Sequence, residues 1–330
     1  MFIMTSDIIV GKYKAVKPNA VKWKCSVSNY VDTCSIKLPL AKYLKSTVEG
    51  TEDVNIVSEK RTVFSEGDAV SVALGYNGDN TVRFKGFVNR INYGTPFELE
   101  CEGYSYQIKK KLFKKQYTTV TIKHLLTDLI AGTDIKLSQY IPDVTINNIT
   151  FKNTPGLKVL EWLEKECACT VFFDFDTLYA GAVRFPIPKP AQKLQLGWNT
   201  VEDKEFRKTI ESDETQINII EKTAKGSVKR TASDMRKFDN ATDVKVRKGL
   251  PAAFLKMLAN ELQKQKNYLG YQGNITCFLI PVFEKSGVAT ISDNRFPERN
   301  GSYFVDTVEG SFDKSGGRQK VILRYYANAN

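Results

Sequence analysis

The feature that most constrains this chain is a period-two alternation of apolar and polar residues. Residues 97–102 (FELECE) place a glutamate at every second position, namely Glu98, Glu100 and Glu102. Residues 21–27 (VKWKCSV) alternate in the same way, with lysine and serine between the apolar residues. Side chains of a β-strand point alternately to opposite faces, so this pattern predicts strands with one buried and one solvated face.

Two hairpins are predicted, one toward each end of the chain. The first spans residues 82–104 with its turn at residues 94–96, and the second spans residues 302–326. Glycine inside a strand often marks a bulge, so we expect one near Gly86 and Phe87. The two hairpins are similar in length and in their place within a strand-rich region, which suggests two comparable β-rich ends.

The middle of the chain has a helical pattern instead. Thr121 can cap a helix that runs to Ala131, where an apolar stripe ends before a glycine. Pro155 is expected at the first position of a second helix, because proline there sacrifices no hydrogen bond. Residues 171–173 and 178–183 then read as a pair of buried strands. These elements form a small α/β module.

The predicted fold class is therefore α+β and β-dominated, with two tube-forming, β-barrel-like domains that flank a small α/β insert. We expect a first β domain at residues 1–105, the insert at 106–196 and a second β domain at 197–330. The second β domain is expected to contain one helix at residues 251–268, opened by a proline.

The charge balance is basic, with a formal net charge of +11. Such a balance can indicate nucleic acid, an anionic membrane or an acidic protein as a partner. The one dense run is residues 109–111, all lysine, followed by Lys114 and Lys115, with Phe113 between them. A groove for nucleic acid combines basic and aromatic side chains in this way, although a solvated face has the same composition. A basic β-barrel nucleic-acid-binding protein is therefore one alternative function.

Motifs for catalysis are missing from the sequence. It has no phosphate-binding loop, no dinucleotide-binding glycine pattern, no HExxH and no GxSxG elbow. Its single histidine, His124, falls in the first predicted helix and is expected to be partly buried and structural. Cys167 and Cys169 lack the paired spacing of a zinc site. We therefore expect no cofactor, no metal, no catalytic residue and no enzymatic activity.

Chemistry by carboxylates alone stays as a second alternative, because glycoside hydrolysis needs just two acids. The candidates are Asp174 and Asp176, which follow a predicted strand, or the row of Glu98, Glu100 and Glu102. A solvated acidic face is the simpler interpretation of both sets. A carboxylate glycoside hydrolase or a carbohydrate-binding adhesin would fit this alternative.

No apolar run approaches the ~20 residues that a membrane-spanning helix needs. The first seven residues also lack the basic segment and apolar core of a secretion signal. We therefore expect a protein made in the cytosol and not inserted into a membrane.

Three segments together resemble the phage baseplate hub family, which includes the late control protein D group. They are residues 83–104, with a glycine-containing strand and its return strand, residues 154–169, with a helix and the start of a strand, and residues 291–318. In the last of these, Ile291-Ser292-Asp293 precedes Gly301-Ser302-Tyr303-Phe304-Val305-Asp306 and a final hairpin. The polar stretch at residues 45–61 departs from the family.

This resemblance implies a structural role in the baseplate of a phage tail or a related contractile injection machine. Family members form trimers in which each subunit gives two tube domains, so that a ring joins a six-fold tail tube to a three-fold spike. The implied partners are two further copies, the tail tube protein, the spike protein and other baseplate proteins. The implied location is the virion tail, assembled in the host cytoplasm.

Two hypotheses concern charge. In the first, Glu98, Glu100 and Glu102 line the lumen of the tube, where negative charge keeps passing DNA from binding. In the second, the excess positive charge lies on outer surfaces that contact acidic neighbouring proteins. The resemblance transfers no catalytic residue to this chain.

Overall fold

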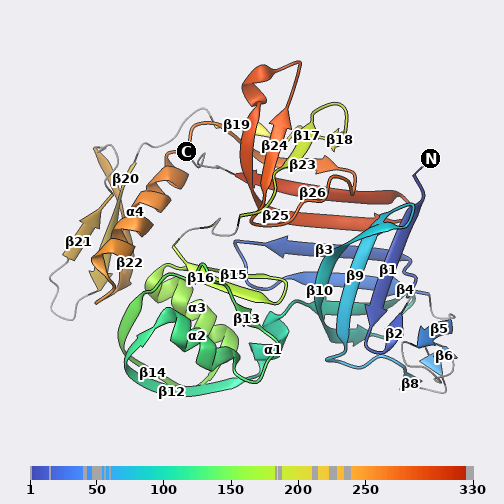
Figure 1. Ribbon diagram of the computed structural model, residues 1–330, viewed down its shortest axis with the longest axis horizontal. Coiled ribbons are helices and arrows are strands. Elements are labelled where there is room, and N and C mark those ends of the chain that lie inside the picture. The colour runs from blue at the N-terminus through green and yellow to red at the C-terminus, as the bar shows by residue number, and fades with distance from the viewer. Residues whose placement is uncertain are drawn as a thin grey trace.

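The fold is β-dominated with four α-helices in the part of the chain described by this computed structural model, which confirms the predicted α+β class (Figure 1). The described residues are 2–14, 16–39, 43–46, 54–55, 57–58, 61–182, 184, 188–209, 215–222, 229–233 and 239–324. Most of the polar stretch at residues 45–61 lies outside them, as do the ends of the strands predicted to reach residues 183 and 326.

The N-terminal β unit consists of six long strands packed around one core. In spatial order they are β3 (Ala20–Ser26), β4 (Thr33–Leu38), β11 (Phe97–Glu102), β10 (Asp79–Asn92), β9 (Ala69–Tyr76) and β1 (Met4–Val10). The alternation predicted from the sequence fills this core, because every second residue of each strand points inward. Short strands extend the unit beyond β1: β2 (Tyr13–Lys14), β5 (Tyr43–Ser46) and β6 (Val54–Asn55), with β7 (Val57–Ser58) and β8 (Arg61–Thr62) paired separately.

The C-terminal β unit repeats that strand order. Its first strands, β18 (Thr200–Glu202) and β19 (Arg207–Lys208), pair one after the other with β23 (Tyr271–Cys277). The order then continues with β26 (Gly316–Arg324), β25 (Gly301–Asp313), β24 (Val288–Ser292) and β17 (Gln192–Gln195). A short 3-10 helix (Pro297–Arg299) lies before β25. The hairpins β10–β11 and β25–β26 therefore occupy the same position in their units, as their similar lengths suggested.

The equivalence extends to individual hydrogen bonds. Val88 of β10 donates to Asp68 O (2.9 Å) and accepts from Gly67 N (2.8 Å), and Val305 of β25 donates to Gly287 O (2.9 Å) and accepts from Ser286 N (2.9 Å). Immediately after each of these valines the ladder to the return strand shifts register by one residue. The two units therefore share one strand order and one bulge position. They differ at the outermost pair, because β1 runs antiparallel to β9 whereas β17 runs parallel to β24.

The two units are joined edge to edge. Strand β25 pairs antiparallel with β3 over seven residues, from Thr307 opposite Ser26 to Asp313 opposite Ala20. Figure 1 shows β25 and β26 lying directly beside β3 and β4. One continuous sheet therefore runs through both ends of the chain.

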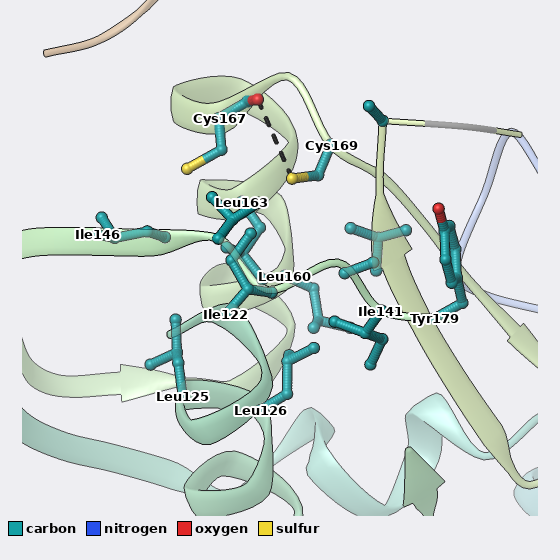
Figure 2. Packing of buried hydrophobic residues seen from close by; sticks show 14 of the residues in the cluster. Ile122, Leu125, Leu126, Ile141, Ile146, Leu160, Leu163, Cys167, Cys169 and Tyr179 are labelled. Carbon is teal, nitrogen blue, oxygen red and sulfur yellow. Dashed lines mark hydrogen bonds between the residues drawn. The ribbon is translucent and has the colours of Figure 1, made fainter. Parts of the chain in front are cut away.

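The middle of the chain forms the predicted α/β module, with helices α1 (Ser105–Lys109), α2 (Ile122–Ile130) and α3 (Gly156–Cys167). Its hairpin of β15 (Thr170–Asp174) and β16 (Thr177–Gly181) pairs with β13 (Lys136–Leu137). The module also contains a two-stranded ribbon of β12 (Leu112–Thr121) and β14 (Thr145–Pro155), which was not predicted. Figure 2 shows Leu125, Leu126, Leu160 and Leu163 of the two long helices packed together in the module's core.

A second small α/β unit lies beside this module. It contains β20 (Thr215–Lys222), β21 (Lys229–Ala232), β22 (Asn240–Arg247) and the helix α4 (Ala252–Lys266), whose position confirms the helix predicted after Pro251. Ile217, Ile219 and Phe254 belong to the same hydrophobic cluster as the core of the middle module. The division of the chain at residues 105/106 and 196/197 stays a prediction.

Two local predictions were wrong in detail. The bulges of β10 lie between Val82 and Phe84 and between Val88 and Arg90, on either side of Gly86 rather than at it. Gly86 instead allows the backbones of β10 and β11 to lie close together, since a Cβ there would lie 2.1 Å from the carbonyl oxygen of Glu102. Pro155 is the N-cap of α3 rather than its first residue, so the helix begins one residue later than predicted.

Candidate assembly surface

One face of the continuous sheet is polar across both β units. A row of directly opposed residues crosses six strands on this face: Thr276, Lys320, Glu309, Lys24, Thr33 and Glu102. The next row is Arg318, Ser311, Lys22, Ser35, Glu100 and Arg90. The residues between these positions along each strand point to the opposite face, into the cores of the two units.

This surface, which we call the polar face, carries alternating charge. Lys24 Nζ lies 2.8 Å from Glu309 Oε1, across the junction of β3 with β25. On the next strands, Glu98 accepts a hydrogen bond from Ser35, and Glu100 accepts one from Asn92. A hollow of about 590 Å³ lies over the same strands, lined by residues of both units that include Lys22, Glu100, Glu309 and Arg318.

The three glutamates singled out in the sequence do share one face, as predicted, but they are not equivalent. Glu98 and Glu100 are half-buried, while Glu102 is buried. Lys109 Nζ lies 2.7 Å from Glu102, and Ser105 donates to the same carboxylate at 2.9 Å. Because lysines and arginines stand among the glutamates, the face is mixed in charge rather than acidic.

Behind the polar face, buried polar contacts connect the two β units. Arg83 of β10 donates to the carbonyl oxygen of Leu279 (2.5 Å). Ser26 of β3 and Thr307 of β25 share a hydrogen bond of 2.7 Å between their hydroxyl groups. Lys285 forms an ion pair of 2.5 Å with Asp32, and burial raises the pKa of that carboxyl. Buried ionic groups need such partners, so these contacts fix how the units meet.

The candidate catalytic carboxylates are both engaged in ion pairs. Lys189 Nζ lies 2.9 Å from Asp174 and 3.0 Å from Glu284. Burial opposes the charge of Lys189, but these two carboxylates raise its pKa above the usual value. Asp176 is paired with Lys136 at 2.8 Å. Through Lys189, Asp174 thus connects the middle module with Glu284 of the C-terminal region, while Asp176 pairs within the middle module.

The prediction for His124 was wrong, because the side chain is 65% exposed. It lies on the outer side of α2, one turn from Asp128, with 3.8 Å between the ring nitrogen Nε2 and the carboxylate. The apolar stripe of that helix uses its neighbours Leu125 and Leu126 instead. His124 is therefore an exposed residue beside Asp128 and does not belong to the core.

The basic run of residues 109–115 does not form a groove with an aromatic floor. Phe113 is buried and packs against Phe151, with 5.5 Å between ring centroids. Lys109 is held by Glu102, and Lys115 lies 3.4 Å from Asp128. The aromatic ring that base stacking would need is therefore part of the core.

The six cysteines are free thiols, five of them buried and Cys25 half-buried. Burial raises the pKa of the Cys25 thiol, and the same effect raises the pKa of Cys101 to about 12. Among the described residues, no group of three or more potential metal ligands is present. In the same part of the chain, no helix is both long and apolar enough to cross a bilayer.

Comparisons by sequence find no matching family model and no similar curated protein. Comparisons by structure find similar folds, of which we describe three. A 43 kDa tail protein of prophage MuSo2 from Shewanella oneidensis is 12% identical with a TM-score of 0.64, over 97% of this chain and 98% of that one. A tail protein from Neisseria meningitidis MC58 is 12% identical with a TM-score of 0.62, over 98% and 97%.

The third likeness is to the c3393 protein of E. coli, a component of the type VI secretion system described as similar to the T4 bacteriophage tail proteins gp27 and gp5. It is 8% identical with a TM-score of 0.57, over 98% of this chain and 77% of that one. The fold is therefore that of phage tail proteins and of this secretion component. The resemblance to the baseplate hub family is confirmed at the level of the fold.

Proposed function

We propose that this chain is a structural subunit of the baseplate hub of a phage tail or a related injection machine, without enzymatic activity. Three copies would close into a ring that joins a six-fold tail tube to a three-fold spike. The observation that carries this proposal is the repetition of one strand order in the two β units, joined edge to edge in one sheet. Two equivalent units per chain give six positions in a trimer.

The polar face would then form the wall of the lumen. Its lysines and glutamates alternate, so the net charge per area stays small, and DNA would pass without strong attraction or repulsion. This replaces the acidic lining expected from Glu98, Glu100 and Glu102 alone. The exposed basic residues elsewhere, such as Lys110 and Lys114, are proposed to contact acidic neighbouring proteins.

Native mass spectrometry of the purified protein, alone and with the tail tube protein of the same genome, tests this function. We expect a species of three chains and its complex with the tube protein. A chain that stays monomeric at high concentration with both tube and spike proteins present would contradict the proposal. Hydrolysis of a cell-wall glycan by the purified protein would favour the hydrolase alternative.

A further inference from the structure

The two β units differ in whether another described strand pairs with the outer edge of their longest strand. Beyond its bulge, β25 pairs with β26 on one side and with β3 on the other. Beyond the equivalent bulge, Arg90, Ile91 and Asn92 of β10 pair only with β11 in the described part of the chain. Thr307 and Val308 of β25 are 4% and 3% exposed, whereas their counterparts Arg90 and Ile91 are exposed and half-buried.

A second open edge lies at the opposite end of the sheet. The strand pairing from β26 through β23 to β19 matches the pairing from β11 through β4 to β3. In this match, Arg207 and Lys208 of β19 are the counterparts of Lys24 and Cys25 of β3. β3 is paired on both sides, but β19 is paired only with β23 among the described strands. Thr209 N donates to the carbonyl oxygen of Gly270, the residue just before β23. The N–H and C=O of the preceding residue, Lys208, therefore point away from β23.

We infer that the free edge of β10 in one copy pairs antiparallel with the free edge of β19 in a second copy. The contact repeats, between molecules, the junction that β25 and β3 form within one molecule. The internal register carries over: Arg90 faces Thr209, Ile91 faces Lys208, and Asn92 faces Arg207. This inference rests on the proposed ring and names the strands that close it.

Three observations favour a second copy as the occupant. Unpaired strand edges are templates for another strand, and here each copy offers two that complement each other. The junction of β25 with β3 within the chain shows that the equivalent edges of the two units pair antiparallel. A repeated contact between two different surfaces closes a ring when its rotation returns the last copy to the first, which is the arrangement that the proposed function requires.

The internal junction also indicates how the contact could be strengthened. Lys24 and Glu309 face each other as an ion pair across β3 and β25. In the inferred contact, Arg207 takes the position of Lys24, but Asn92 takes that of Glu309. Asn92→Glu would supply the missing negative charge, and Asn92→Lys would place two positive charges opposite each other.

Cross-linking tests the register directly. We would combine Asn92→Cys with Arg207→Cys and oxidise with diamide, which accepts the two electrons and two protons that a pair of thiols releases on forming a disulfide. We expect covalent species of two and three chains, with little background because the native cysteines are buried or half-buried. Each single variant, and Asn92→Cys combined with Lys193→Cys on β17, should give no three-chain species.

A backbone variant tests the same contact independently. Lys208→Pro removes an N–H that points away from β23, so it deletes a hydrogen bond between copies and none within the copy. We expect the oligomer's dissociation constant to rise roughly tenfold or more, while Lys208→Ala leaves it unchanged. Asn92→Glu should lower that constant at low salt, although it also replaces the donor that Asn92 offers to Glu100 within the copy. Thermal melts of the monomer should be the same for the wild type, Lys208→Pro and Lys208→Ala.

The possible results distinguish the inferred contact of β10 with β19 from the proposed hub function. A wild type that forms trimers, with no cross-link in the double-cysteine variant and no effect of Lys208→Pro, would overturn the inferred edge contact and leave the hub function standing. A wild type that never associates would overturn both.

Discussion

Lys285 Nζ lies 2.5 Å from each carboxylate oxygen of Asp32, and both side chains are more than nine-tenths buried. Lys285 also donates to the carbonyl oxygen of Ser26 at 3.4 Å. Asp32 directly precedes β4, and Lys285 belongs to the segment that leads into β24. This one ion pair therefore ties together segments of the two β units that are 253 residues apart in sequence.

We expect Asp32→Asn to lower the free energy of unfolding by about 3–5 kcal/mol, because the charge of Lys285 would stay buried without its partner. The double variant with Lys285→Met should recover a large part of this loss, since it removes both charges. Urea unfolding followed by circular dichroism measures both. A loss below 1 kcal/mol in the single variant would show that the pair does not hold the units together.

Glu164 on α3 should make stability depend on pH. Burial, with a contribution from the charge of Glu161, raises the pKa of Glu164 from 4.5 to about 7. The folded state therefore holds this proton more tightly than the unfolded state. Its contribution to stability is present below pH 4.5 and is lost as the pH rises through 7.

Glu164→Gln removes that dependence. We expect the variant to be more stable than the wild type by about 1 kcal/mol at pH 8 and equal to it at pH 4, a value reduced because the side chain is half exposed. Thermal melts at the two pH values give the comparison. Equal differences at both pH values would mean that the Glu164 pKa is not raised.

The β3–β25 junction depends on a glycine. A Cβ at Gly310 would lie 1.9 Å from the ring of Trp23, which covers the glycine from the opposing strand. We expect Gly310→Ala to lower the free energy of unfolding by about 1–3 kcal/mol, because the ring must shift within a packed core. The neighbouring change Ser311→Ala, on the polar face, should stay within about 0.5 kcal/mol. A tolerated alanine at residue 310 would argue against close packing here.

The mixed charge of the polar face can be tested with DNA. We expect the wild type to bind neither single- nor double-stranded DNA measurably at physiological salt. Glu98→Lys combined with Glu309→Lys replaces two glutamates of the face by lysines and removes the partner of Lys24, so it should produce binding that weakens steeply as salt rises. Fluorescence anisotropy with a labelled oligonucleotide measures both. Tight binding by the wild type would favour the nucleic-acid-binding alternative instead.

The elements with strong local patterns could be predicted from the sequence. Alternation located β11 and the hairpins, and Thr121 marked the start of α2 with a side-chain bond to His124 N. The common face of Glu98, Glu100 and Glu102 followed from the same period. These features depend on residues close together in the chain, where the pattern and the geometry are directly linked.

Features set by distant contacts could not be found in this way. No local sequence pattern predicts that β3 pairs with β25 or that Lys285 forms an ion pair with Asp32. The ribbon of β12 and β14 was missed because most of its residues are exposed, which leaves its alternation without an apolar face. His124 was misplaced because the apolar leucines beside it suggested burial, although helical period puts it on the outer side.

Because β3 pairs with β25, the sheet of this protein can be completed only after the C-terminal strands have been synthesised. Ser26 and its partner Thr307 are separated by 281 residues, so an early strand must wait for one of the last to leave the ribosome. Until then β3 keeps a bare edge, and Phe312 is missing from the N-terminal core. A chain that stops before β25 would keep β3 unpaired on that side, so an interrupted translation product would expose a strand edge to other chains.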